Sequence, residues 1–151
     1  MITEARYRHV RQMLDVGLRP ADLQEIEAGT DLDVETVLVR SWLYSEKRWV
    51  LITDGHPCAM WGVAAWPTDK TVGSPWLLAT PEFSNHKLTF IKNTKNFVTD
   101  MARSYSRLAN FVDVRHSESI RWLKWAGFTV AVSSVQFGPK RMPFYPFHLE
   151  Q

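Results

Sequence analysis

A block near the C-terminal end of the chain, Phe111–Phe128, places the strongest limit on the fold. Apolar residues alternate up to Val114, a polar corner follows, and about ten residues of helical character end at Gly127. Ser117 can accept a hydrogen bond from a free amide of the first turn, and Gly127 suits the left-handed residue that ends a helix. The block therefore predicts a strand, a cap, a short helix and a stop, a connection that many α/β proteins contain.

The segment before this block completes a strand–helix–strand unit. Trp76–Thr80 is almost entirely apolar, which predicts a strand buried on both faces. The chain from about Ser84 to Tyr105 has an apolar face at helical spacing and predicts one long helix. Because a strand, a helix and a strand usually form a right-handed crossover, we expect the two strands to run parallel and side by side.

An Asp-Gly pair gives the clearest local signal. Two extended, largely apolar runs, Trp49–Thr53 and the residues from Cys58 to Trp66, flank Asp54 and Gly55. Asp-Gly supplies the two positive-φ residues that a tight hairpin turn requires. The sequence therefore predicts a β-hairpin at this point.

The two ends of the chain carry weaker patterns. Ala5–Met13 alternates irregularly, and we expect a first strand there. Pro20 and Asp33 are suited to begin two helices. Near the C-terminus we expect a sixth strand at Thr129–Val132, after which the tail rich in proline and aromatic residues, Gly138–Phe147, either adds an edge strand or lies on the surface.

Composition limits the class of protein. With 151 residues, 45% of them hydrophobic, residues 1–151 are expected to form one domain with one core. The 18 basic and 16 acidic residues are interspersed, so nucleic-acid binding is unsupported. A single cysteine, Cys58, indicates a reducing compartment. Neither a signal-peptide pattern nor a membrane-length apolar run is present, and we expect a protein that is not secreted and not inserted in a membrane.

Motifs for catalysis are sparse. There is no Walker phosphate loop, HExxH or GxSxG, and the five histidines lack metal-ligand spacing, so no metal is expected. Glu82 and His86 follow the Trp76–Thr80 strand, at the edge where an open sheet usually holds its ligand. Either residue is a candidate general base, and an ordinary loop without a chemical role is the alternative.

The order of these elements resembles the Gcn5-related N-acetyltransferase (GNAT) fold. The resemblance rests on the hairpin at Asp54 and Gly55, the buried strand before the long helix, and Ser119–Phe128 with its terminal glycine and phenylalanine. It implies an α/β (α+β) domain with a mixed, mostly antiparallel sheet of about six to seven strands. Strands four and five would form a parallel, splayed pair, and about four helices would complete the fold.

The resemblance also implies an acetyl-CoA site, from which this sequence departs. The family holds the pyrophosphate on a glycine-rich loop after the fourth strand. That loop, Thr80–Lys87, has no glycine here, and Pro81 removes one amide donor. His116 and Leu123 stand where the family often carries an asparagine and a tyrosine that acts as general acid, and leucine cannot donate a proton. If acyl-CoA binds, the residues expected to hold it are Leu78, Thr80, Ser84, Asn85, His86 and Lys87.

A narrower resemblance is to the small GNAT-like proteins of short-tailed bacteriophages, a group that includes internal virion protein A. It rests on Arg19–Asp22, Ala59–Gly62, Ser74–Pro81, Asp113–Phe128 and the aromatic tail. It implies a pseudoenzyme whose surface, in a chain with seven tryptophans, docks onto other virion or assembly proteins. Such a protein would act in the host cytoplasm during assembly, with incorporation in the virion as one outcome.

Three functions therefore stay open. The first is the virion-associated structural or assembly component with a degenerate acetyl-CoA site. The second is an acyl-CoA-dependent N-acyltransferase in which Ser84–Lys87 replace the glycine loop and Glu82 or a water deprotonates the amine. The third is a small-ligand or nucleic-acid accessory role that uses the lysines of the long helix. A homo-oligomer is compatible with each of them.

Overall fold

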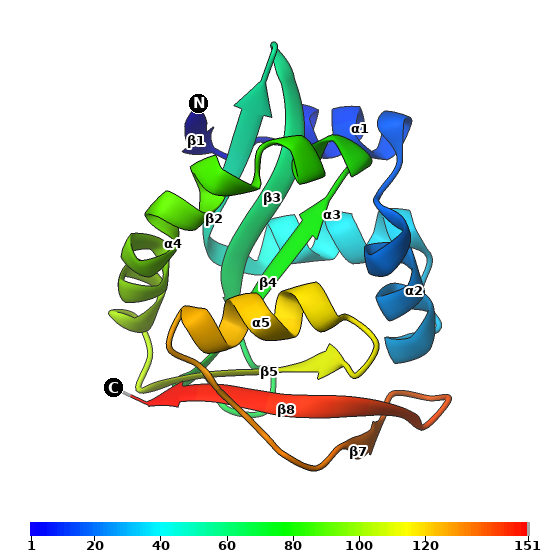
Figure 1. Cartoon of the computed structure of the whole chain (residues 1–151), viewed down its shortest axis with the longest axis vertical. Coiled ribbons are helices and arrows are strands. Elements are labelled where there is room, and N and C mark those ends of the chain that lie inside the picture. The colour runs from blue at the N-terminus through cyan, green and yellow to red at the C-terminus, as the bar shows by residue number, and fades with distance from the viewer. Residues whose placement is uncertain (151) are drawn as a thin grey trace.

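Eight strands and five α-helices make up the residues that the computed structural model describes, 1–150 (Figure 1). The expected class, α+β with a mixed and mostly antiparallel sheet, is confirmed, with one strand and one helix more than expected. In chain order the elements are β1 (Ile2–Glu4), α1 (Tyr7–Val16), α2 (Pro20–Gly29), α3 (Val34–Tyr44), β2 (Ser45–Thr53), β3 (His56–Ala65), β4 (Val72–Ala79), the 3₁₀ helix η1 (Pro81–Asn85), α4 (Lys87–Ala102), β5 (Arg107–Asp113), α5 (Ser117–Trp125), β6 (Thr129–Val130), β7 (Val135–Phe137) and β8 (Met142–Glu150).

One sheet contains all of the strands. They lie in the order β1-β2-β3-β4-β5-β8-β6, and β7 pairs with β8 beside β6. Each pairing is antiparallel except that of β4 with β5. The predicted hairpin is formed by β2 and β3, and Asp54 and Gly55 at its turn have positive φ angles of 52° and 80°.

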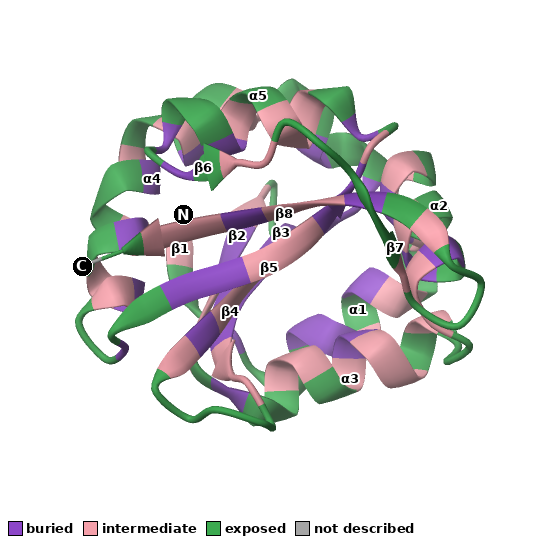
Figure 2. Cartoon of the chain, turned by 90° about the horizontal axis from the view of Figure 1, so that it is seen from below, coloured by how far each residue is buried: buried purple, intermediate pink, exposed green. Residues whose placement is uncertain are grey.

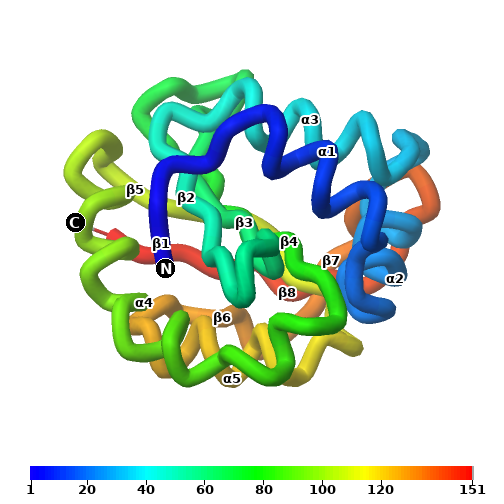
Figure 3. The backbone as a smooth tube through the Cα atoms, turned by 90° about the horizontal axis from the view of Figure 1, so that it is seen from above, coloured from blue at the N-terminus to red at the C-terminus, as the bar shows by residue number. Residues whose placement is uncertain are grey.

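Helices cover both faces of the sheet, α1 and α3 on one side and α4 and α5 on the other (Figure 3). Because successive side chains of a strand point to opposite faces, Met60 packs with the helices of the first face and Trp61 with those of the second. The sheet therefore has a hydrophobic core on each side, and Figure 2 shows buried positions concentrated on the strands between the helices.

The parallel strands β4 and β5 meet at their first residues only. Val72 pairs with Arg107 and Gly73 with Leu108, after which β4 follows β3 and β5 follows β8 in a different direction (Figure 1). The expected splayed pair is confirmed. The divergence corrects one expectation: Trp76 and Leu77 are half-buried rather than buried on both faces, because β4 pairs with β5 only at Val72 and Gly73 and both residues line the cavity that opens beyond.

The first predicted strand, Ala5–Met13, is wrong. Most of it is the helix α1, and the strand at this end is the short β1 that precedes it. Val10 and Met13 are both fully buried, three residues apart, so the apolar positions follow a helical period that the intervening arginines obscure. The Arg6 amide donates to His9 Nδ1 at 2.9 Å, which holds the first turn.

The long helix is interrupted and shorter than predicted. The 3₁₀ helix η1 occupies its start, and His86, with φ −131° and ψ 17°, separates it from α4, which ends at Ala102. Ser117 is not the N-cap residue of α5. His116 occupies that position, and its side chain accepts no hydrogen bond from the amides of the first turn. Gly127 has the predicted positive φ, 103°. Among residues 1–150, no helix is at once long and apolar enough to cross a membrane.

The C-terminal tail is an inner strand rather than an edge strand or a surface segment. β8 lies between β5 on one side and β6 and β7 on the other. Phe147 and His148 of β8 pair with β6, and Met142 to Phe144 pair with β7. Pro146 lies between these two groups and pairs with neither strand. Proline lacks an amide hydrogen, so a position at which the neighbouring ladder is interrupted tolerates it. β6 itself stops at Val130, two residues earlier than predicted.

Candidate functional site

The divergence of β4 and β5 leaves a cavity of about 260 Å³ in the middle of the molecule, here called the central cavity. Glu25 of α2, Thr30 directly after it and Ser41 of α3 line it on one side. Leu78 and Asn110 line it where the two strands separate. Further side chains of α4 line its other end. The central cavity thus connects the two faces of the sheet through the gap between β4 and β5.

A second cavity of about 470 Å³, here called the outer cavity, lies between α4 and α5. Its wall is largely apolar where it adjoins the central cavity, and the two share Leu77, Phe90, Trp122 and the polar Ser119. Four charged residues line it as well. Three are cations, Arg19, Lys87 and Arg121, and one is an acid, Glu118. Since Arg19 is paired with Asp22 and Lys87 with Glu118, the outer cavity offers a polar wall with a small excess of positive charge next to an apolar one.

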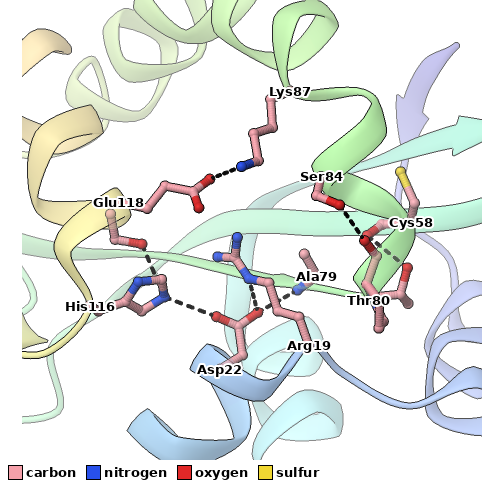
Figure 4. Close-up of polar contacts among 11 residues, drawn as sticks. Arg19, Asp22, Cys58, Ala79, Thr80, Ser84, Lys87, His116 and Glu118 are labelled. Carbon is pink, nitrogen blue, oxygen red and sulfur yellow. Dashed lines mark hydrogen bonds and ion pairs between the residues drawn. The ribbon is translucent and has the colours of Figure 1, made fainter.

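Asp22 is a buried carboxylate, 2% exposed, that joins α2 to β4 and α5 (Figure 4). Its Oδ2 accepts hydrogen bonds from Arg19 Nε and from the Ala79 backbone amide, both at 2.8 Å. Its Oδ1 lies 3.3 Å from His116 Nε2. One carboxylate thus holds the end of β4 in place beside both cavities.

His116 has two partners on the same ring nitrogen. Ser119 Oγ lies 3.1 Å from Nε2, the atom that also faces Asp22. A serine–histidine–carboxylate relay requires the hydroxyl and the carboxylate to bind different ring nitrogens, so this arrangement is not a nucleophilic triad. Since His116 and Ser119 both line the central cavity, the cluster places an imidazole and a hydroxyl at its wall.

Glu25 is the ionisable residue that best suits proton transfer in the central cavity. It is half-buried, one helical turn after Asp22, and its Oε2 accepts from the Asp113 backbone amide at 3.0 Å. Burial raises the pKa of Glu25, and the nearby Asp22 and Asp113 add to the rise, while the Asp113 amide and His116 oppose it. A carboxyl group with a raised pKa in a cleft is a typical general base.

Asp113 has the opposite electrostatic environment. Burial would raise its pKa, but hydrogen bonds from Arg115 outweigh burial and lower it. Arg115 donates to the two carboxylate oxygens from Nε and Nη2 at 3.0 and 2.7 Å. Asp113 is therefore held as an ion pair, and Glu25 is the carboxyl of the two that can exchange a proton.

Solved structures share the fold of this protein over nearly the whole chain. An acetyltransferase of the GNAT family from Streptococcus pneumoniae has a TM-score of 0.66 at 14% identity, with 99% of this chain and 98% of that one covered. The fold is that of the GNAT acetyltransferases. Two further examples are a ribosomal-protein-alanine N-acetyltransferase from Brucella melitensis (TM-score 0.70, 12% identity, 100% and 99% covered) and the aminoglycoside acetyltransferase AAC(6')-Ib in complex with coenzyme A (TM-score 0.70, 13% identity, 100% and 94% covered).

The sequence matches no protein-family model and no curated protein. The GNAT fold is therefore established by structure alone, and the predicted fold is confirmed. The narrower resemblance to phage virion proteins has no counterpart among these matches and stays a prediction.

In this GNAT fold the loop after β4 is wound into η1. The amides of Phe83 and His86 bond to the carbonyls of Thr80 and Phe83 at 3.1 and 2.9 Å. Phe83 is buried under the turn, and the Arg19 guanidinium lies 5.4 Å from its ring centre. Because those two amides are already paired, an anion here would depend on side chains and on the free amides of the first turn of α4.

Glu82 and His86, the predicted general-base candidates, pair with each other and lie outside both cavities. His86 Nε2 is 3.1 Å from Glu82 Oε1, and the Glu82 side chain is 54% exposed. The structure therefore does not bring either residue to the gap between β4 and β5. Their role as bases stays a prediction that this position does not favour.

The residues predicted to hold acyl-CoA have different positions. Leu78 lines the central cavity and Lys87 the outer one. Thr80 and Ser84 use their hydroxyls internally, toward the carbonyls of Cys58 at 3.4 Å and Pro81 at 2.9 Å. Asn85 and His86 line neither cavity.

Lys87 forms an ion pair with Glu118 across the outer cavity, at 2.7 Å (Figure 4). The hydrogen bond from Lys87 lowers the pKa of Glu118. An anion that binds Lys87 must share it with this carboxylate. Leu123, where the family carries a tyrosine, is 5% exposed and lines the central cavity without a polar atom.

The sequence did not reveal Asp22 or Glu25 as site residues. They stand three residues apart on one face of α2, beside the buried Ile26, and this placement of acids next to an apolar position was their one detectable signal. No group of three histidine, cysteine, aspartate or glutamate side chains among residues 1–150 could hold a metal ion.

Replacing Glu25 with glutamine should make the protein more stable at neutral pH. Because the folded-state pKa is raised, the neutral carboxyl stabilises the fold below the ordinary glutamate pKa, about 4.3, and this contribution is lost as pH rises through the folded pKa. Glutamine never ionises, so the gain should appear above that pH and vanish at acid pH. Thermal unfolding from pH 4 to 8 measures it, with Glu27→Gln, exposed on the same helix, as control. An equal shift at every pH would contradict the assignment.

Proposed function

We propose that this protein binds an acyl-CoA and transfers its acyl group to an amine. The observation that carries the proposal is the pair of adjoining cavities at the divergence of β4 and β5, one with three cations in its wall and the other lined by Glu25. The GNAT fold supports the same reaction class, since two of the matched structures are named as N-acetyl- or aminoglycoside acetyltransferases.

The residues of the outer cavity suit the phosphates of coenzyme A. Arg121 supplies positive charge, and Arg19 and Lys87 do so while each also faces a carboxylate, Asp22 or Glu118. The first turn of α4 contains no acid. Amides at the start of a helix and the positive end of its dipole favour anions without any glycine. The apolar wall between α4 and α5, which includes Trp122, suits the uncharged arm of the cofactor.

Acyl-CoA would supply an activated thioester whose carbonyl carbon an amine can attack, with the thiolate as leaving group. Glu25, which lines the central cavity, would take the proton from the amine. Ser119 lines both cavities and bonds to His116, so its hydroxyl is the proton-bearing group at their junction. Ser119 would donate the proton to the leaving thiolate, which Leu123 cannot do.

A non-enzymatic role in a bacteriophage particle is the second candidate. Two observations favour it: Leu123 puts a hydrocarbon at the expected position of the acid, and Glu118 neutralises Lys87. In this candidate the fold is kept and the chain acts by binding other virion or assembly proteins. The cofactor titration described next separates the two.

Titration of the protein with coenzyme A in a calorimeter should give saturable binding. Lys87→Ala should weaken it roughly tenfold to a hundredfold, because a charge-assisted contact is lost and Glu118 is left facing the phosphates. Lys92→Ala, exposed on the same helix and outside both cavities, is the matched control and should bind like the parent protein. Absence of saturable binding at millimolar coenzyme A would refute the acyltransferase and favour the virion component.

A further inference from the structure

The central cavity extends well past the site of acyl transfer. Beyond the gap between β4 and β5 it continues between the sheet and α4, in a part here called the acyl arm. The acyl arm is lined by one residue of β3 and five of α4: Trp61, Phe90, Thr94, Phe97, Val98 and Met101. Phe90 and Met101, the first and last of the α4 residues, are eleven residues apart, which corresponds to about 16 Å of helix. A two-carbon acetyl group can contact only a small part of that length.

The wall of the acyl arm is uncharged and largely aromatic. The ring centres of Phe90 and Phe97 lie 4.8 and 5.1 Å from that of Trp61. The Thr94 hydroxyl is already paired, since it donates to the Phe90 carbonyl at 3.0 Å and accepts from Trp122 Nε1 at 3.1 Å. With no charged side chain in this wall, the matching occupant is a hydrocarbon group.

Trp61 carries the one unsatisfied polar group of this region. Its indole Nε1 is buried and, among the side-chain nitrogens and oxygens of residues 1–150, is the buried atom without a hydrogen-bond partner. A buried donor without a partner is unusual in a well-packed core. A hydrocarbon chain offers this N–H no acceptor, so the choice of occupant depends on the apolar side chains of the wall and not on Trp61 Nε1.

The size of the central cavity matches a group longer than acetyl. A cavity of about 150 Å³ lined by apolar side chains binds benzene, a six-carbon ligand. The central cavity holds about 260 Å³, part of which the acceptor amine would use at the Glu25 end. The remaining room suits an acyl chain of about six to eight carbons.

We infer that the preferred donor is a medium-chain acyl-CoA whose hydrocarbon chain lies in the acyl arm between α4 and the sheet. This inference rests on the proposed function, because the chain must enter from a thioester held in the outer cavity. Leu77, Phe90 and Trp122 line both cavities, so a chain that passes these residues reaches the acyl arm directly.

Equilibrium binding of coenzyme A, acetyl-CoA, hexanoyl-CoA and octanoyl-CoA tests the inference. Burial of one methylene improves affinity about fourfold, so hexanoyl-CoA should bind at least tenfold more tightly than acetyl-CoA. Its binding should also change tryptophan fluorescence through Trp61 and Trp122, whereas coenzyme A alone should leave the Trp61 contribution unchanged.

Variants of α4 test where the hydrocarbon chain of the acyl-CoA lies. Val98→Phe fills the acyl arm and should remove the preference for hexanoyl-CoA while affinity for coenzyme A is kept. Phe97→Trp, at a half-buried position, does the same with less strain should Val98→Phe fail to fold. Leu88→Phe adds an aromatic ring at an exposed position of the same helix and should keep the preference.

The outcomes separate the inference from the proposed function. If coenzyme A and acetyl-CoA bind and hexanoyl-CoA binds no more tightly, the inference is wrong and the proposed function stands. A preference for hexanoyl-CoA that survives both Val98→Phe and Phe97→Trp also overturns it. If none of the four ligands binds, the proposed function and the inference fail together.

Discussion

Replacement of Asp22 with alanine is expected to lower the free energy of unfolding by about 3–5 kcal/mol, the usual effect of removing one partner from a buried ion pair. The variant leaves the Arg19 guanidinium, the Ala79 amide and the His116 ring without their shared acceptor. Arg19 still faces the outer cavity and His116 keeps Ser119, but the Ala79 amide, fully buried at the end of β4, is left without an acceptor. The loss therefore exceeds that of a single hydrogen bond.

Urea unfolding followed by circular dichroism measures this change. Asp22→Asn should be less damaging, because the amide oxygen can still accept from Ala79, although it no longer carries the charge that faces Arg19. Asp15→Ala, an exposed acid on α1, is the control and should change stability by less than about 0.5 kcal/mol. A loss below about 1 kcal/mol for Asp22→Ala would show that the cluster does not hold β4.

Phe90→Ala should be about as damaging, with a loss of about 3–5 kcal/mol. Phe90 is buried, and its ring centre lies 4.8 Å from Trp61, 5.6 Å from Phe83 and 5.4 Å from Trp122. Its removal would leave a void between the central and outer cavities, since Phe90 forms part of both walls. Poor collapse of that void makes the upper part of the range the expected result.

Leu88→Ala is the matched control for this prediction. Leu88 stands two residues earlier on α4 and is 72% exposed, so its truncation should stay within about 0.5 kcal/mol. Chemical unfolding of both variants gives the comparison. Similar losses in the two would mean that α4 is stabilised by its helix propensity and not by the aromatic contacts of its inner face.

The elements predicted correctly depend on residues close together in the chain. The turn at Asp54 and Gly55 requires two positive-φ residues, and the stop at Gly127 requires one, so each element follows from its own few residues. The strand–helix–strand unit likewise carried its periodicity locally. These signals together were enough to predict the GNAT fold.

The wrong predictions share another cause. Ala5–Met13 has too few apolar residues to separate a period of two from a period of 3.6, and only contact with β3 and α3 buries Val10 and Met13. The tail that ends in Phe147 looks unfit for an inner strand because of its prolines. Interruption of the neighbouring strands opposite Pro146 depends on where β6 and β7 begin and end, which local composition does not determine.

Some residues of the candidate site could likewise be predicted from the sequence, and others could not. Leu78 could be named from its position near the end of a strand and Lys87 from its position at the start of the following helix, a rule that holds for open sheets in general. Glu25 could not, because its importance comes from the burial that raises its pKa and from the cavity that it faces.

The amino-acid sequence by itself determined the hairpin, the crossover unit and the absence of glycine from the loop after β4, since each depends on residues within one element or turn. The tertiary structure alone decided that Asp22 meets His116, 94 residues further along the chain, and that the gap between β4 and β5 opens into a cavity. Contacts of that kind form only when separate elements pack, because burial, pairing and pKa depend on neighbours that are distant in the chain.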